Sequence, residues 1–293
     1  MPHATPWPVW IALYLYLAGV SGGAFAASVA ASFLGPKYRN VARWGALLSP
    51  WPVLIGTGML VMDLGSPLRF WMLLVKVNPR SVMSMGTFVI SLFSLVAVLY
   101  CWHQLYTEKK VKFTLLPEPV LKLVQYLGIP LAVALGTYTG FLLNASRAIT
   151  LWNNGVLPLI FLASALSTGV AAVIVAVAAT GKWDVVKNEV VNLAIADAVL
   201  MGLEIFALAA YVWSLHVGNM AQQAALSFLN ANYGLLFWGG VWAAGLLLPL
   251  AIKLFTKGES SGKAILNGTL VLAGGLMLRI IIVMAGQAAT PLY

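Results

Sequence analysis

Residues 156–180 read VLPLIFLASALSTGVAAVIVAVAAT, an apolar stretch without one charged side chain. About 20 such residues in a helix cross the hydrocarbon layer of a bilayer, so this stretch predicts a transmembrane helix. The whole chain has the same character, because 61% of its 293 residues are hydrophobic and 9% are charged. A soluble domain carries roughly 25% charged residues. The composition therefore excludes a water-soluble fold and predicts an all-α integral membrane protein.

Comparable apolar runs, bounded by charge, proline or glycine, recur along the chain. They fall at 8–34, 44–64, 83–106, 123–144, 156–180, 190–215, 233–256 and 264–285. Eight crossings place both termini on one side and leave no length for a catalytic domain outside the lipid. We expect one membrane domain, residues 1–293, and similar openings of the first and fifth runs favour two four-helix bundles. The first run lacks a basic leader, which predicts a retained helix and not a signal peptide.

The basic residues divide unequally between the two faces. One face has only Arg69, Lys76, Arg80 and Arg147, and the 216–232 loop beside them has no Lys or Arg. The opposite face has Lys37, Arg39, Arg43, Lys109, Lys110, Lys112, Lys122, Lys182, Lys187, Lys253, Lys257 and Lys263. The positive-inside rule then places both termini outside the cytoplasm, in the plasma membrane of a bacterium or archaeon. The net charge of +9 is thereby explained by basic residues that orient the protein in the membrane and contact anionic lipid. Nucleic-acid binding is not expected.

The outer loop between the second and third runs is dense in turn-forming, charged and aromatic residues. Residues 63–71 read DLGSPLRFW and residues 78–86 read NPRSVMSMG. A chain reversal at the Gly-Ser-Pro turn could pair Asp63 with Arg69, and such a pair could serve only to fix the loop. The alternative is that the loop forms a docking surface for a partner, with Arg69, Lys76 and Arg80 as contacts.

A second outer cluster follows the fourth run. It contains Tyr138, about two turns inside the helix end, and Trp152 and Asn153 in the loop beyond, while Tyr14 has a comparable depth in the first run. Tyrosine and tryptophan at this depth commonly anchor a helix at the membrane interface. Their other use is to hydrogen-bond a quinone carbonyl and to relay its proton between aromatic walls.

These segments resemble a known family. The 63–86 loop, together with YLYLAGVSGG at residues 14–23, is similar to the NrfD/PsrC family of polysulfide-reductase-type membrane subunits. The resemblance covers essentially the whole sequence, and its most specific parts are this loop and the spacing from Tyr138 to Trp152 and Asn153. It implies an anchor of two four-helix bundles that binds menaquinone or ubiquinone near the outer face. Tyr138 then falls on the family's quinone-binding tyrosine, and Tyr14 falls where some members have a quinone-contacting histidine.

The resemblance also implies partners on the outer face. An iron–sulfur, ferredoxin-like subunit would pass electrons to a catalytic subunit, expected to be of the molybdopterin type, so this protein alone would not convert the terminal substrate. The resulting hypothesis is a quinone-binding membrane subunit of a respiratory oxidoreductase. Its expected quinone site consists of Tyr138, Tyr14, Asp63 as a proton relay, and Trp152 with Asn153 near the mouth.

Three charged residues lie within the predicted helices. Asp197 and Glu204 belong to the sixth run and Arg279 belongs to the eighth. Charged groups are costly in hydrocarbon and should face the bundle interior. The spacing of seven places both acids on one helix face, about 10 Å apart along the axis. They could form a proton path, or one of them could form a buried ion pair with Arg279 that fixes the helix register.

The remaining alternatives concern haem and transport. His103 and His216 fall near opposite ends of their helices, and a bis-histidine haem needs two imidazoles at one depth, so we expect no haem in this chain. One cysteine permits no cysteine-ligated cluster, and no metal site is expected. Buried acids in a helical bundle would also suit a secondary transporter or a proton-conducting channel. A third interpretation is a purely structural anchor, in which the outer pocket would be closed.

Overall fold

The computed structural model describes residues 7–62, 67–69, 71–75, 78, 81–107, 116–255 and 260–289. The elements are α1 (Val9–Leu34), η1 (Pro36–Tyr38), α2 (Arg39–Leu48), α3 (Pro50–Met62), η2 (Pro67–Arg69), α4 (Met72–Val75), α5 (Val82–Thr107), α6 (Glu118–Asn144), α7 (Leu157–Thr180), α8 (Trp183–His216), α9 (Met220–Gly234), η3 (Leu235–Leu247), α10 (Leu248–Phe255) and α11 (Ser261–Ala288). Within these ranges, 8 helical segments are long and apolar enough to cross a membrane. The predicted all-helical fold is confirmed, and the number of long apolar helices agrees with the predicted eight crossings.

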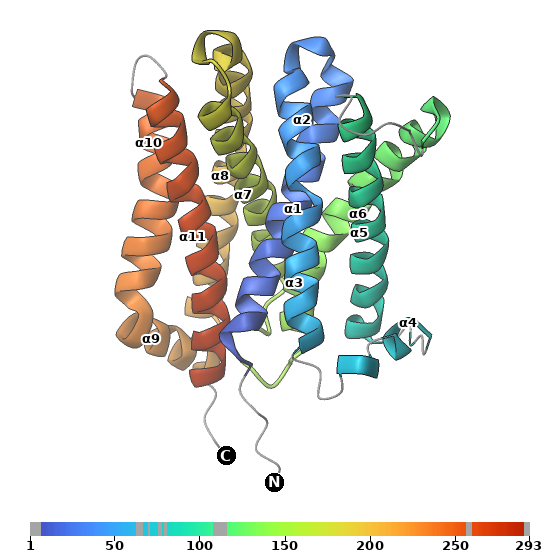
Figure 1. The fold of residues 1–293 in the computed structure, drawn as a ribbon. Coiled ribbons are helices and arrows are strands. Elements are labelled where there is room, and N and C mark those ends of the chain that lie inside the picture. Colours follow the sequence, from blue (N-terminus) through green and yellow to red (C-terminus); the bar gives the residue numbers. More distant parts are fainter. Residues whose placement is uncertain are drawn as a thin grey trace.

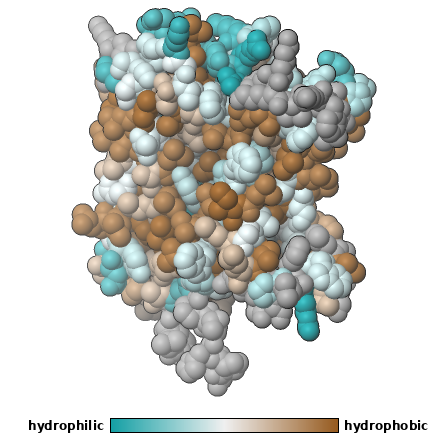
Figure 2. All heavy atoms as spheres, in the orientation of Figure 1, coloured by the Kyte–Doolittle hydropathy of each residue, from teal (hydrophilic) through white to brown (hydrophobic). Residues whose placement is uncertain are grey.

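The spans run alternately up and down, so that α1 begins and α11 ends at the same end of the molecule (Figure 1). The short helix α4 and the start of α9 lie at this end as well. Figure 2 shows a broad hydrophobic band around the middle and hydrophilic residues gathered at the opposite end. This distribution accords with the uneven placement of Lys and Arg along the sequence. The side of the membrane that each end faces stays a prediction.

Helices α1 and α7 form the centre of the molecule, and they are the most buried of the spans. Glycine permits their close approach. A Cβ atom on Gly23 would lie 2.2 Å from the carbonyl oxygen of Ala165, and one on Gly169 would lie 2.3 Å from the Cα of Gly23. Small residues at such crossings are what membrane helices need in order to pack without a hydrophobic driving force. Helix α6, from the N-terminal half of the sequence, contacts both central helices. Helices α8 and α11, from the C-terminal half of the sequence, contact α7. The division into two four-helix bundles stays a prediction.

The second span is divided into α2 and α3 at Ser49 and Pro50, because proline has no N–H to continue the helical ladder. The hydroxyl of Ser21 donates to the carbonyl oxygen of Ser49 and so satisfies one acceptor at the break. At the other end of α2, the Glu189 carboxylate of α8 accepts hydrogen bonds from the backbone N–H groups of Asn40 and Val41 at 3.1 and 3.2 Å. A carboxylate is favoured at a helix N-terminus, so this contact fixes α2 against α8.

Several helix boundaries differ from the sequence prediction, and two of them show the physical reason. The 216–232 segment, expected as a long loop, is mostly the helix α9, which begins at Met220 behind a capping box between Asn219 and Gln222. Its glutamine and asparagine side chains lower the hydropathy without preventing a helix, since they lie on an exposed face. The sixth span begins at Trp183, not at 190, because charged residues such as Asp184 suit a first helical turn.

The seventh span contains a π-helix at η3, Leu235–Leu247, between two α-helical segments. Gly245 of η3 meets Gly274 of α11 so closely that a Cβ atom on Gly245 would lie 2.6 Å from the Cα of Gly274. A π-helix is rare, and the wider turn changes which residues face a neighbouring helix. Here it accompanies the closest backbone contact between these two elements.

Candidate functional site

Tyr138 lies near the termini-side end of α6, with its side chain largely buried (8% exposed). Its phenol ring packs directly on Gly86 of α5. A Cβ atom added to Gly86 would lie 1.8 Å from Cζ and 2.2 Å from the hydroxyl oxygen of Tyr138. Only glycine leaves room for the ring at this contact, so the backbone of α5 sets the position of the Tyr138 hydroxyl.

Tyr14 of α1 is the neighbour of Tyr138, and the two phenols interact. Tyr14 is 1% exposed, and its ring packs against Gly56 of α3, whose added Cβ would lie 3.3 Å from Cδ2 of Tyr14. Within the described residues its hydroxyl makes no well-formed hydrogen bond. A buried hydroxyl without a full partner is costly unless a further group completes it. The structure thus brings together the two tyrosines that the sequence singled out.

An apolar groove of 670 Å³ lies between α5 and α6, and Tyr138 lines it. Its other lining residues are mainly apolar and include Met85, Val89, Ile129 and Phe141. Small-molecule sites are typically apolar hollows with few polar groups that fix the orientation of the ligand. The Tyr138 hydroxyl is such a group.

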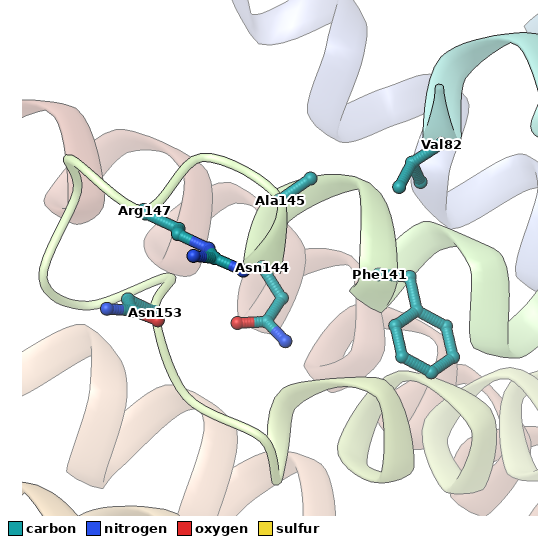
Figure 3. Close-up of a pocket in the computed structure, with 6 residues that line it drawn as sticks. All are labelled: Val82, Phe141, Asn144, Ala145, Arg147 and Asn153. Atoms are coloured by element: carbon teal, nitrogen blue, oxygen red, sulfur yellow. The ribbon is translucent and has the colours of Figure 1, made fainter. Parts of the chain in front are cut away.

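A second hollow of 430 Å³ adjoins the groove, since Val82 and Phe141 line both. Its other lining residues are Ala145 and three polar residues, Asn144, Arg147 and Asn153, at the end of α6 and in the following loop. Figure 3 shows the Arg147 side chain extending toward Asn144, with Asn153 on the loop beside them and Val82 and Phe141 on the other side. This polar hollow therefore lies at the termini-side end of α6, next to the apolar groove.

The other residues expected at a quinone site are placed differently. Asp63 lies outside the described residues. Trp152 lines neither hollow; it is 1% exposed, and its Nε1–H donates to the carbonyl oxygen of Ile282 in α11 at 2.8 Å. Its ring also contacts the Trp7 ring at a centroid distance of 5.0 Å. Trp152 therefore holds the α6–α7 loop against α11, while the adjacent Asn153 faces the polar hollow.

The expected docking surface is described in part. Arg69 ends the short helix η2 and is exposed, as is Trp71 beside it, at 51%. Lys76 and Arg80 lie outside the described residues. The loop after α6 shares this end of the molecule, and Arg147 there is also exposed. Two exposed arginines and a tryptophan thus lie at the same end of the bundle.

A buried ion pair joins α8 to α10. The Lys253 ammonium lies 2.5 Å from the Asp197 carboxylate, with side chains 7% and 0% exposed respectively. Asp197 also accepts a hydrogen bond of 2.7 Å from the Ser167 hydroxyl of α7. Lys253 lies in the last turn of α10, as the assignment to a helix end expected, but its long side chain reaches inward. Asp197 is therefore paired, with Lys253 and not with Arg279.

A second polar cluster surrounds Arg279, which is completely buried. Its guanidinium donates to the Ser164 hydroxyl at 2.7 Å and to the carbonyl oxygens of Gly275 and Phe161 at 3.1 and 3.3 Å. Glu204, also buried, interacts with Ser164 and with the guanidinium. The alternative of a buried ion pair between Glu204 and Arg279 that only fixes the helix register stays a prediction.

The two clusters are linked through α7. Ser164 and Ser167 are one helical turn apart and so lie on the same face of that helix. They connect the Asp197–Lys253 pair to the Glu204–Arg279 cluster as a row of buried polar groups. The sequence identified the charged members but missed both serines and Lys253. Small hydroxyl residues three apart within an apolar run were the signal available for the serines.

Metal ligands do not gather in the part of the protein described here. Within those ranges, no group of three or more His, Cys, Asp and Glu side chains could hold a metal ion. His103 lies near the end of α5 and His216 at the end of α8, and these helix ends point to opposite ends of the bundle (Figure 1).

Comparison with known proteins places this arrangement in a family. The family described as "Polysulphide reductase, NrfD" matches residues 1–291. The sequence is 32% identical to the "Protein NrfD homolog" of Haemophilus influenzae, over 98% of this chain and 97% of the relative. It is also 32% identical to the C subunit of the polysulfide reductase of Wolinella succinogenes, over 96% of this chain and 93% of the relative. "Protein NrfD" of Escherichia coli matches with 32% identity over 96% of this chain and 94% of the relative. With a match along nearly its full length, the chain belongs to the polysulphide reductase NrfD family of membrane subunits.

Proposed function

We propose that this protein is the quinone-reactive membrane subunit of a respiratory oxidoreductase and exchanges electrons between the quinone pool and a docked iron–sulfur subunit. The observation that carries the proposal is the buried Tyr138 phenol, which packs on Gly86 at the wall of an apolar groove between α5 and α6. A lipid-soluble quinone, menaquinone or ubiquinone, combines an apolar tail with a ring whose carbonyl oxygens need hydrogen-bond donors. The groove offers both kinds of surface.

The residues of the site have distinct roles in this proposal. Tyr138 donates a hydrogen bond to one quinone carbonyl, and the Tyr14 hydroxyl, which lacks a well-formed partner, supports it as a second donor. A bound quinone supplies the electron chemistry and takes up or releases protons as it does so. Asp63 is retained as a candidate proton relay, and Asn153 borders the polar mouth. Trp152 contributes by holding the loop that carries Asn153.

The relatives support a role within a larger assembly. One of them is named as a single lettered subunit of a polysulfide reductase, so that protein works with other subunits. We propose that here the partners are a ferredoxin-like iron–sulfur subunit and a catalytic subunit of the molybdopterin type, on the outer face of a bacterial or archaeal plasma membrane. Arg69, Lys76 and Arg80 would contact the iron–sulfur subunit. Substituting Arg69 and Arg80 together should release that subunit from membranes, and undiminished retention would count against this contact.

The row of buried polar groups supports a proton path toward the quinone site. Asp197 with Lys253 lies toward the end of the bundle opposite the termini, and Glu204 with Arg279 lies deeper, with the two serines between them. In this path the carboxyl groups hold protons and the hydroxyl groups pass them on. Glu204→Gln should slow quinone-linked turnover and spare electron transfer from an artificial donor to the catalytic partner. Equal rates in variant and parent would remove Glu204 from the path.

A transporter or proton-conducting channel is the second candidate, and the same buried charges favour it. Copurification separates the two functions. Stoichiometric iron–sulfur and catalytic subunits support the oxidoreductase, whereas a protein that is stable alone and active in transport supports the second candidate. The structure adds one consideration, because the apolar groove with the tyrosine pair lies apart from the charged row and has no use in a simple channel.

A photoreactive azidoquinone tests the site directly. In membranes that contain the full complex, it should label peptides of α5 and α6 around Gly86 and Tyr138, and excess unlabelled quinone should suppress the labelling. A probe attached mainly to α8, α10 or α11 would place the site elsewhere and overturn the assignment. The same experiment on Tyr138→Phe reports whether loss of one hydroxyl weakens binding.

A further inference from the structure

A second groove, of 330 Å³, lies among α1, α2, α7 and α8, away from the tyrosine pair. Its walls are almost entirely Ala, Gly, Leu and Val side chains of the membrane-spanning helices. Ala30 and Leu34 of α1 border it and are exposed. The surrounding solvent at this depth is lipid hydrocarbon, so the groove is shaped and lined to accept a flexible apolar chain.

The groove ends at a polar pair. The Asn192 side-chain amide of α8 donates a hydrogen bond of 2.8 Å to the Tyr38 hydroxyl, and both residues line the groove. A hydroxyl that accepts one hydrogen bond still has its own O–H to donate, and the Asn192 amide has a second N–H. The pair therefore offers two donors at the mouth of an apolar groove.

Positive charge flanks this pair. The Lys37 ammonium lies 5.8 Å from the centroid of the Tyr38 ring, and both Lys37 and Arg39 are exposed. The nearby Glu189 carboxylate does not cancel this charge at the mouth, because it is buried and bound to the Asn40 side chain at 2.6 Å and to backbone N–H groups of α2. An acceptor-only anion would complement these donors and cations.

We propose that this groove is a binding site for one anionic phospholipid, with an acyl chain along α1 and the phosphate at Tyr38, Asn192 and Lys37. Basic pockets between membrane helices recognise lipid headgroups through the same combination of charge and donors. A quinone would fill the apolar part but would bring only neutral carbonyls to the cations. The site is independent of the proposed electron-transfer function, since it shares no residue with the tyrosine groove.

Native mass spectrometry of the purified complex, with added phosphatidylglycerol and phosphatidylcholine, tests the site. The parent protein should retain phosphatidylglycerol in preference to phosphatidylcholine. Ala30→Phe fills the groove with a ring and should lose the retained lipid, whereas Ala209→Phe, at an exposed alanine of α8 outside the groove, should keep it. Tyr38→Phe removes one donor while keeping the ring and should weaken phosphatidylglycerol retention by about tenfold or more.

Each other outcome counts against the site. Retention of both lipids to the same extent would overturn recognition of the headgroup. Equal lipid loss in Ala30→Phe and Ala209→Phe would show that the effect is not local to the groove. If Ala30→Phe displaces quinone from the extract and leaves phospholipid unchanged, the groove is a quinone site. Because Tyr38→Phe is a conservative change, an unaltered affinity in that variant would also overturn the proposal.

Discussion

At the scale of single residues, the site depends on glycines that face aromatic rings. At Gly86 and Gly56, the absence of a side chain lets a tyrosine ring of another helix pack against the backbone. The sequence predicted Tyr14 and Tyr138 because phenols at one depth suit a quinone. It could not predict the contact with Gly86, because a glycine in a helix looks the same whether a ring or lipid covers it. Gly58, two residues after Gly56, has open space at its Cβ position.

Gly86→Ala tests whether α5 positions the Tyr138 hydroxyl. The new methyl group would occupy the place of the phenol, so the ring must move, and a displacement of about 1 Å can lower a rate by about 100-fold. We expect quinone-linked turnover to fall by about 10- to 100-fold while electron transfer from an artificial donor persists. Gly58→Ala is the matched control and should retain full activity. A folded Gly86→Ala complex with turnover within about twofold of the parent would contradict the positioning role.

At the scale of elements, contacts between helices determine features that the sequence could not predict, such as the partner of a buried charge. Hydropathy located the eight spans, but it placed the start of the sixth near 190 and predicted a loop for α9, because charged and amide residues lower the average wherever they occur. The partner of Asp197 depends on which helices are neighbours. That information resides in packing, and the choice of Lys253 over Arg279 follows from the contact between α8 and α10.

The pair between Asp197 and Lys253 makes a prediction about stability. Lys253→Met leaves a buried carboxylate without its cation, a change that costs about 3–5 kcal/mol in comparable pairs. We expect a clear drop in the thermal unfolding midpoint of the detergent-solubilised protein. The double variant Asp197→Leu/Lys253→Met should recover most of the loss. Lys187→Met, at an exposed lysine, serves as the control, and an equal drop in both single variants would argue against a specific pair.

The contact between η3 and α11 allows a second test at this scale. Gly245→Ala would force a methyl group against the backbone of Gly274 and should destabilise the fold by about 1–3 kcal/mol. Gly239 lies in the same π-helix, and a Cβ there would meet its nearest neighbour at an ordinary 3.7 Å. Gly239→Ala should therefore be neutral or slightly stabilising. Identical thermal unfolding midpoints for the two variants would show that the close approach does not matter for stability.

At the scale of the whole molecule, the protein is a membrane bundle with two separated kinds of polar chemistry. The tyrosine groove lies between α5 and α6 near the termini-side end, and the charged row runs through α7, α8, α10 and α11. The sequence predicted the fold class, the family and the charged residues that face inward. Asp197 and Glu204 are seven residues apart on one helix, and this spacing predicted that they share a face. Both side chains are buried in the structure.

The orientation can be measured with single introduced cysteines in a Cys101→Ser background. Gly155→Cys lies in the exposed loop after α6, and Lys182→Cys lies in the exposed turn between α7 and α8, at the other end of the bundle. An impermeant maleimide should label Gly155→Cys in intact cells and should reach Lys182→Cys only after lysis. The reverse pattern would invert the proposed topology and move the partner subunits to the cytoplasmic face.

The central claim is that Tyr138 binds the quinone headgroup, and turnover of the complete complex with quinone as donor or acceptor tests it most directly. Tyr138→Phe keeps the ring on Gly86 and removes only the hydroxyl. Loss of one donor in a water-poor site costs about 1–3 kcal/mol, so turnover should fall about 5- to 150-fold, with electron transfer from an artificial donor unchanged. Tyr126→Phe, at an exposed tyrosine of the same helix, should behave like the parent. Quinone-linked turnover of Tyr138→Phe within about twofold of the parent would contradict the account.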